Sequence, residues 1–247
     1  MYIESIGQSG LRIKYFDQVI YVDPYLSNSV QILDSNDLER LLPIPFSAEE
    51  VTDADWVLLT HDHIDHCDPM TIPTIAKKSP HSKFLGPAPV IEKLISWGIS
   101  GERVYLANKA RCLLLDGLEV DVIPAAHPSI EYDDNHNLLC VGYLLNAQNE
   151  KVYISGDTVV EQSILDVVKK LGPVDTVILP VNESNFFRER RGIIGNMSVR
   201  EAFGFAEEVG AKRMIPVHWD MFAENSVSQD EIRLIYKQMN PSFELSL

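Results

Sequence analysis

Residues 60–66 read Thr60-His61-Asp62-His63-Ile64-Asp65-His66 and hold three of the chain's seven histidines. Imidazole nitrogens and carboxylate oxygens are the ligands that borderline divalent cations prefer, so a single loop dense in both can bind metal from two directions. The alternative is a polar surface loop, which would need three histidines to fall in six positions by chance. The run therefore predicts a metal site.

The residues on either side place this run at the end of a strand. Trp56-Val57-Leu58-Leu59 is a short apolar stretch, typical of a buried strand. Asp68-Pro69 has the pattern of a helix N-cap followed by proline at the first helical position, which predicts a helix from Pro69 to about Lys77. The metal-competent side chains are therefore expected in a loop between two rigid elements.

Length and composition are those of an ordinary folded protein. The chain has 247 residues, 45% of them hydrophobic and 23% charged, and we expect a single domain over residues 1–247. A formal net charge of -15 works against binding to the phosphates of nucleic acid. Because the sequence has neither an apolar run of membrane-spanning length nor a secretory signal pattern, we expect a cytoplasmic protein without membrane contact.

Short apolar segments alternate with turn signals and amphipathic segments along the whole chain. Strands are expected at residues 3–6, 11–15, 19–22, 56–59, 83–85, 113–115, 118–123, 138–145, 152–155, 176–179 and 213–217. Helices are expected at residues 69–77, 89–97, 161–171 and 198–209, with a long loop at residues 27–47. This mixture predicts an α/β (α+β) fold, in which two mixed β-sheets face each other with helices outside.

Four of the expected strands lead into a residue that can bind metal. These residues are His61, His127, Asp157 and His218. Any one of them alone is more often a satisfied histidine or a turn residue. Together with the loop at residues 60–66, they indicate one site that is assembled from distant parts of the chain on rigid supports.

The order His-x-His-x-Asp-His, then a distant His, an Asp and a last His resembles that of the metallo-β-lactamase superfamily over most of the chain. The resemblance implies a four-layer αββα sandwich and a site for one or two divalent ions, Mn²⁺ or Zn²⁺. The implied ligands of the first ion are His61, His63 and His127, and those of the second ion are Asp65, His66 and His218. Asp157 is the implied bridging carboxylate.

A narrower resemblance lies in Gly195-Asn196-Met197-Ser198 and in residues 216–223, Pro-Val-His-Trp-Asp-Met-Phe-Ala. Both are similar to the branch of the superfamily that contains L-ascorbate-6-phosphate lactonase. That branch implies a manganese-using hydrolase that opens a small phosphorylated lactone or ester with metal-activated water, and that forms homo-oligomers. In this reading Asp65 and Asp157 are catalytic, while His136 and Asn196 stabilise the developing oxyanion.

Contacts to an anionic substrate are expected from an arginine cluster. Arg188, Arg190 and Arg191 stand out in an acidic chain and are predicted, together with Asn196, to bind the substrate. The alternative for these arginines is a solvated loop. Charge alone favours that alternative.

Two other functions agree with the same residues. A phosphodiesterase would use the same two-metal centre, because that centre stabilises an in-line displacement equally well. A metal-binding protein without catalysis would need only the ligand set, with its coordination shell closed by protein atoms. Substrate screening separates these alternatives from a lactonase.

Overall fold

The computed structural model describes residues 1–108, 112–115, 117–148 and 150–247. The chain divides into two compact units, each built from three segments. Unit 1 comprises Met1–Asn108, Tyr132–Leu139 and Met221–Ala223, and unit 2 comprises Lys109–Glu131, Cys140–Asp220 and Glu224–Leu247. Among the described residues, no helix has the length and apolar character needed to cross a membrane. That the whole chain forms one domain stays a prediction.

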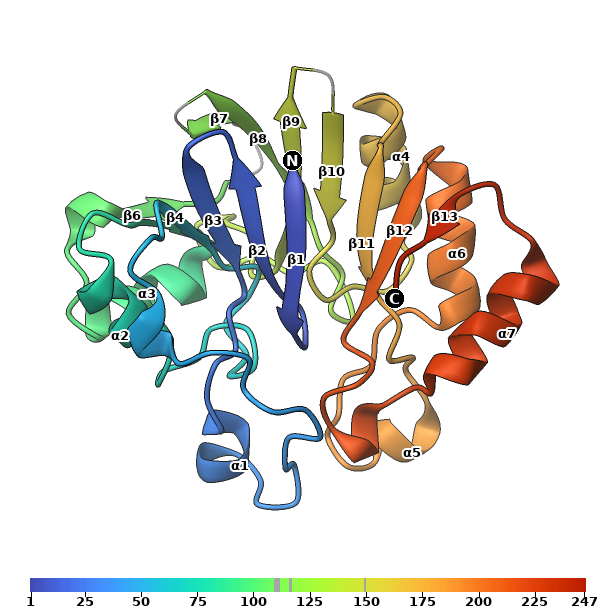
Figure 1. Cartoon of the computed structure of the whole chain (residues 1–247), viewed down its shortest axis with the longest axis horizontal. Coiled ribbons are helices and arrows are strands. Elements are labelled where there is room, and N and C mark those ends of the chain that lie inside the picture. The colour runs from blue at the N-terminus through green and yellow to red at the C-terminus, as the bar shows by residue number, and fades with distance from the viewer. Residues whose placement is uncertain (109–111, 116, 149) are drawn as a thin grey trace. The chain divides into compact units, whose positions relative to one another are not determined.

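The described part of unit 1 contains a mixed sheet with the strand order β1-β2-β3-β4-β5-β6 (Figure 1). Its strands are β1 (Tyr2–Gly7), β2 (Gly10–Tyr15), β3 (Gln18–Val22), β4 (Trp56–Leu58), β5 (Lys83–Gly86) and β6 (Val104–Leu106). Strands β1 to β3 pair antiparallel, whereas β3 to β6 pair parallel. The carboxyl ends of the parallel strands therefore meet at one edge, and the chain enters the loop at residues 60–66 from that edge.

Helices cover one face of the unit 1 sheet. They are α2 (Ile72–Lys78) and α3 (Ala88–Ser96). Helix α1 (Ser29–Leu33) lies in the segment between β3 and β4, and short 3-10 turns lie at Ala48–Glu50 and Gly101–Arg103. Helix α3 buries Val90 and Leu94, which are four residues apart and so share one face, against Phe84 of β5. This packing holds the strands, and with them the loop that follows β4.

The start of α2 differs from the prediction. The helix begins at Ile72 rather than Pro69. The Asp68 carboxylate does not cap a helix that starts at Pro69. It accepts hydrogen bonds from the backbone N–H of Met70 (2.8 Å), from the Thr71 hydroxyl (2.5 Å) and from the Ser27 hydroxyl (2.6 Å). These bonds organise a turn ahead of the helix.

The described part of unit 2 contains a second mixed sheet with the strand order β13-β12-β11-β10-β9-β8-β7 (Figure 1). Its strands are β7 (Cys112–Leu115), β8 (Leu118–Pro124), β9 (Val141–Ala147), β10 (Glu150–Ile154), β11 (Thr176–Pro180), β12 (Arg213–Val217) and β13 (Glu244–Leu245). Strands β10 to β13 pair parallel, and the pairs from β7 to β10 are antiparallel. The predicted fold class, with two mixed sheets and helices, is confirmed.

Helices α4 (Gln162–Lys170), α6 (Val199–Glu208) and α7 (Gln229–Met239) pack on the unit 2 sheet, and α5 (Phe186–Glu189) and a 3-10 turn at Ala223–Asn225 lie in its loops. Helix α6 begins where predicted, because Ser198 and Glu201 form a capping box. Its buried Phe203 packs with Phe243 at a ring-centroid distance of 5.6 Å. Helix α7 was not predicted.

Asp175 connects three parallel strands at their amino-terminal ends, opposite the edge that carries the candidate ligands. Its carboxylate accepts hydrogen bonds from the Lys151 backbone N–H (2.8 Å) and from Lys212 Nζ (2.7 Å). Burial raises the pKa of Asp175, but the hydrogen bonds from Lys212 and Lys151 outweigh it, so the pKa lies below the ordinary carboxyl value. Asp175 therefore stabilises the fold as an anion.

We expect Asp175→Ala to lower the free energy of unfolding by about 1 kcal/mol at neutral pH. The pKa of Asp175 is lower in the folded than in the unfolded protein. Its contribution to the free energy of unfolding is therefore fully present above the unfolded carboxyl pKa of about 3.9, and it is lost as the pH falls through the folded-state pKa. Urea unfolding at a series of pH values measures it, with the exposed Asp166→Ala as control. A difference from wild type that does not shrink at acid pH would contradict this role.

Candidate metal centre

Unit 1 gathers four potential metal ligands in the loop after β4. The His61 and His66 rings are buried and lie 4.1 Å apart between centroids, and the His61 and His63 rings lie 4.6 Å apart. Asp65 Oδ2 is 3.6 Å from His66 Nε2. The loop is closed on itself, because the backbone N–H groups of His66 and Cys67 both donate to the His63 carbonyl. The predicted ligands of this unit therefore lie side by side.

The two aspartates of this loop have different partners within unit 1. Gln8 donates from Nε2 to Asp65 Oδ2 at 2.7 Å. Asp62 instead forms an ion pair with Lys93 of α3, with 2.9 Å between Nζ and Oδ2. Asp62 therefore anchors the loop to a helix, while Asp65 remains beside His66.

Asp23, which was not predicted as a site residue, forms hydrogen bonds with this loop. It follows β3, has a left-handed backbone conformation with φ 41°, and is buried. Its carboxylate accepts from His66 Nδ1 at 2.8 Å, from the Thr60 backbone N–H at 2.8 Å and from the Thr60 hydroxyl at 2.5 Å. The signal that could have found it is its position directly after a strand, which also marked the predicted ligands.

Unit 2 gathers three potential ligands at the carboxyl ends of its strands. His127 follows β8, Asp157 follows β10 and His218 follows β12, and all three are buried. Asp157 Oδ2 lies 3.2 Å from His218 Nε2 and 3.8 Å from His127 Nε2. His127 and His218, which are 91 positions apart in sequence, thus both lie close to the Asp157 carboxylate.

Backbone hydrogen bonds join the loops that carry these three residues. The Val159 N–H donates to the Ala126 carbonyl at 2.8 Å, and the Ala126 N–H donates to the Thr158 hydroxyl at 3.0 Å. The Val181 N–H donates to the Val217 carbonyl at 3.1 Å. The His127, Asp157 and His218 side chains are therefore positioned by neighbouring backbone segments rather than by flexible loops.

Asn196 lies at the same edge of unit 2. The next residue, Met197, donates its backbone N–H to the Thr158 carbonyl at 3.2 Å, which places Asn196 near the Asp157 loop. The buried Asn196 amide donates from Nδ2 to Asn182 Oδ1 at 2.9 Å, and Asn182 donates to Asn225 Oδ1 at 3.1 Å. One of the two amide N–H groups of Asn196 is therefore already engaged. Its role in stabilising an oxyanion stays a prediction and would use the second amide N–H.

His136 lies in unit 1, in a turn of residues 132–139. The Asp133 carboxylate shapes this turn by accepting from the Asn137 side chain at 2.9 Å and from the Asn135 and Asn137 backbone N–H groups, both at 2.8 Å. The bond from the Asn137 side chain, followed by those from the backbone, lowers the pKa of Asp133. His136 has a left-handed conformation with φ 61° and an exposed side chain. Its predicted catalytic role stays a prediction.

The three arginines of the predicted anion site have separate partners in unit 2. Arg188 donates to the backbone carbonyls of Glu183 (2.8 Å), Glu224 (3.2 Å) and Ser226 (2.8 Å), so it holds loops together. Arg191 forms an ion pair with the Glu224 side chain. Arg190 lies over the Phe186 ring, 5.6 Å from its centroid.

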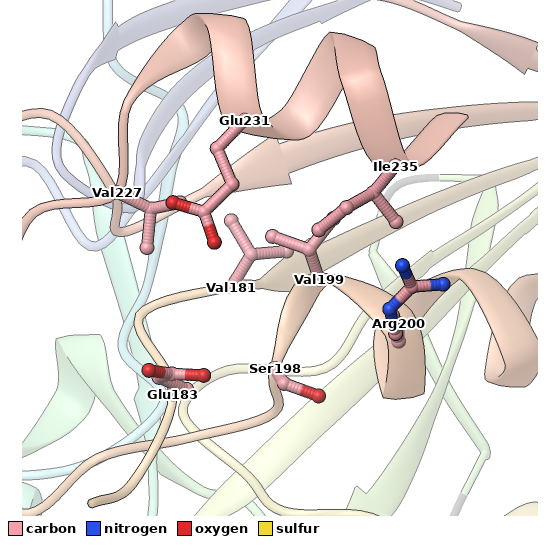
Figure 2. Close-up of a pocket in the computed structure, with 8 residues that line it drawn as sticks. All are labelled: Val181, Glu183, Ser198, Val199, Arg200, Val227, Glu231 and Ile235. Atoms are coloured by element: carbon pink, nitrogen blue, oxygen red, sulfur yellow. The ribbon is translucent and has the colours of Figure 1, made fainter. Parts of the chain in front are cut away.

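A cavity of about 230 Å³ also lies in unit 2, between the end of β11 and the starts of α6 and α7 (Figure 2). Its walls are formed by Val181, Glu183, Ser198, Val199, Arg200, Val227, Glu231 and Ile235. The Glu231 carboxylate extends from α7 toward Val181 (Figure 2). None of the candidate metal ligands is among these wall residues.

The donor sets of both units fit a divalent cation. Imidazole and carboxylate ligands suit zinc, manganese, iron or nickel. Buried carboxylates and imidazoles at short distances are costly unless an ion or hydrogen bonds compensate for them. Burial raises the pKa of the neighbouring Cys67 thiol well above the ordinary value.

Several known proteins are similar in sequence to this chain. A protein of Mycobacterium tuberculosis is 27% identical over 220 residues, which cover 89% of this chain and 59% of the relative. A metal-dependent hydrolase of Caldivirga maquilingensis is 22% identical over 246 residues, covering 97% and 91% of the two chains. The probable L-ascorbate-6-phosphate lactonase of Salmonella heidelberg is 23% identical over 206 residues, covering 78% and 56%. The chain thus spans less than two thirds of the length of the mycobacterial and Salmonella relatives.

A solved structure shows the same fold. The crystal structure of a possible metal-dependent hydrolase from Veillonella parvula superposes with a TM-score of 0.79 at 18% identity, covering 99% of this chain and 95% of that one. The family model described as the beta-lactamase superfamily domain matches residues 18–219, which include every candidate metal ligand. The chain belongs to this superfamily, among the proteins with the metallo-β-lactamase fold.

Proposed function

We propose that the protein is a metal-dependent hydrolase whose histidines and aspartates hold one or two divalent cations. The observation that carries the proposal is the position of the buried Asp157 carboxylate, 3.2 Å from His218 and 3.8 Å from His127. The loop at residues 60–66 would supply the remaining ligands. Membership of the superfamily and the Caldivirga hydrolase support the same activity.

The assignment of ligands follows the resemblance of the motifs. The first ion would be held by His61, His63 and His127, the second by Asp65, His66 and His218, and Asp157 would contact both. When bound, such ions polarise an ester oxygen and lower the pKa of a coordinated water to about 7. Asp65 would accept and return a proton during hydrolysis, and its contact with Gln8 would keep the carboxylate oriented for this.

A small phosphorylated lactone or ester is the substrate class that we propose. The similarity to the Salmonella lactonase supports it, as does the buried Asn196 amide beside the Asp157 loop. Because Arg188 is engaged with three backbone carbonyls, Arg190 and Arg191 are the arginines of the cluster better suited to a substrate phosphate. Manganese or zinc as the ion, a cytoplasmic location and a homo-oligomeric assembly belong to the same proposal.

Metal analysis tests the proposal together with a substrate screen. We expect protein purified without chelators to carry manganese or zinc and to hydrolyse members of a panel of sugar-acid lactones and their phosphorylated forms. Release of a phosphate monoester from bis-esters, without lactone opening, would favour a phosphodiesterase. Stoichiometric metal without turnover on the whole panel would favour a metal-binding protein that does not catalyse.

His61→Ala is expected to lower metal affinity by more than about 100-fold, since removing a group that merely orients a ligand already costs about 10- to 100-fold. Isothermal titration with Zn²⁺ and with Mn²⁺ measures this. His81→Ala is the matched control, because His81 is exposed and matches none of the ligand positions. Equal affinities of the two variants would exclude His61 as a ligand.

A further inference from the structure

The cavity of about 230 Å³ in unit 2 has a charge distribution of its own, and none of the candidate metal ligands lines it. Glu183 and Glu231 lie at one end and Arg200 at the other, with Val181 and Val199 between them (Figure 2). We propose that this cavity is a binding site for a small aliphatic amine, with the ammonium group at the glutamate end and the alkyl chain on the apolar floor. The inference does not depend on the proposed hydrolase activity.

The floor of the cavity is apolar and continuous with the core of unit 2. Val181 and Val199 are 0% and 4% exposed and belong to the core cluster, and the partly buried Val227 and Ile235 pack against that cluster. Each methylene group that leaves water on this floor is expected to strengthen binding about fourfold. Because sites for drug-sized ligands have volumes of about 300–1,000 Å³, a cavity of about 230 Å³ suits a chain of a few methylenes.

The glutamate end carries more negative charge than its neighbouring cation compensates. Among the residues that the structure describes, neither the Glu183 nor the Glu231 carboxylate has a hydrogen-bond or ion-pair partner. Burial lowers the pKa of the Arg188 guanidinium, and the charges of both glutamates oppose this shift. Two carboxylates that act on one guanidinium leave one negative charge over, so this end favours a ligand with a single positive charge.

Arg188 also fixes the walls at the glutamate end. It donates to backbone carbonyls on both walls, at Glu183 on one and at Glu224 and Ser226 on the other. These bonds join the segment after β11 to the segment before α7, and Glu231 is held in the first turn of α7. This end is therefore formed before a ligand binds, which reduces the ordering cost of binding.

The other end of the cavity gives less reason to expect an anion. Arg200 is exposed and donates from Nη2 to Gln238 Oε1 of α7 at 2.7 Å. Its guanidinium is thus solvated and already engaged, whereas the two glutamate carboxylates have no such partner among the described residues. The charges of the cavity therefore favour an amine over a carboxylic acid of the same length.

Chemical-shift titration of ¹⁵N-labelled protein with hexylammonium chloride tests the site. We expect saturable changes at the backbone amides of the wall residues Val181, Val199, Val227 and Ile235. Hexan-1-ol has the same chain without the charge and should bind about tenfold more weakly, as two exposed ion pairs would be lost. Methylammonium lacks the chain and should not reach saturation at the same concentrations. Equal binding of hexylammonium and hexan-1-ol, or changes that do not saturate, would overturn the inference.

Glutamine variants test the glutamates without changing the size of their side chains. We expect Glu231→Gln to bind hexylammonium about three- to fivefold more weakly, and the double variant with Glu183→Gln about tenfold more weakly. Asp230→Asn is the matched control, because Asp230 is exposed in the same turn of α7 and does not line the cavity. Thermal unfolding reports any general loss of structure. If Asp230→Asn weakens binding as much as Glu231→Gln, net charge rather than this site attracts the amine.

The pH dependence separates this site from coordination of the amine to a bound metal ion. Coordination uses the neutral amine, whose fraction rises about 100-fold between about pH 6 and pH 8, because an alkylammonium group has a pKa of about 10.4. The ammonium form hardly changes over this range, so we expect equal hexylammonium affinity at both pH values. A large rise in affinity with pH would assign the amine to the metal centre and overturn the inference. Absence of hydrolase activity would contradict the proposed function and leave this result unchanged.

Discussion

Replacing Asp157 with alanine is expected to remove bound metal and to lower turnover by more than about 1000-fold. Asp157 is the residue that the unit 2 loops converge on, with two histidines within 3.8 Å of one carboxylate oxygen. By resemblance it would contact both ions, so its loss would affect the whole centre rather than one half. Turnover on the lactone panel and metal content per chain are measured on the same preparation.

Folding is the main alternative explanation for inactivity of this variant. Asp157 is 3% exposed, and a buried carboxylate without a bound cation costs desolvation free energy, which its removal would relieve. We therefore expect the metal-free variant to unfold within a few degrees of the metal-free wild type. Asp166→Ala is the control, an exposed aspartate of the same unit. An Asp157→Ala protein that retains metal and full turnover would remove Asp157 from the centre.

Replacing Gly195 with alanine is expected to destabilise the protein by about 3 kcal/mol. A Cβ at this position would lie 2.3 Å from Ser184 Cα and 2.5 Å from the Glu183 carbonyl oxygen, which are backbone atoms that cannot rotate away. The two segments approach this closely because the Ser184 N–H donates to the Asn196 carbonyl at 3.1 Å. The methyl group must therefore push the backbone at Gly195 away from that of Glu183 and Ser184.

Gly204→Ala is the matched control for Gly195→Ala. Gly204 lies within α6, and no described atom would approach a Cβ there within 4 Å. Alanine is the better helix former, so this variant is expected to gain about 0.5 to 1 kcal/mol. Urea unfolding of the metal-free proteins measures both changes, and opposite signs are expected. A Gly195→Ala protein as stable as wild type would show that the close approach is not required.

Much of the fold was predictable because strand signals are local. Apolar runs such as residues 56–59 and 176–179 have the length and composition of buried strands, and β4 and β11 lie there. Capping residues were equally informative at Ser198, where α6 begins one residue later. The same signal was present before α7, where Ser228 accepts a hydrogen bond from the Glu231 N–H, yet this helix was not predicted.

A prediction failed where a polar side chain had more than one possible partner. Asp68 has the sequence pattern of a helix cap, but it bonds Ser27, 41 residues away, and Thr71. Arg188, whose role in substrate binding stays a prediction, likewise donates to three backbone carbonyls. In both cases the competing partner comes from another part of the chain, which a local pattern does not contain.

By itself the sequence determined the metal-binding character of this protein, because the ligand types and their positions at strand ends are properties of short segments. Tertiary structure alone decided how those ligands are held. Asp23 contacts His66 across 43 residues, and Asp157 meets His218 through the register of parallel strands. The physical reason is that hydrogen bonds and ion pairs depend on distance and direction in space, and these are set by strand pairing and core packing rather than by spacing along the chain.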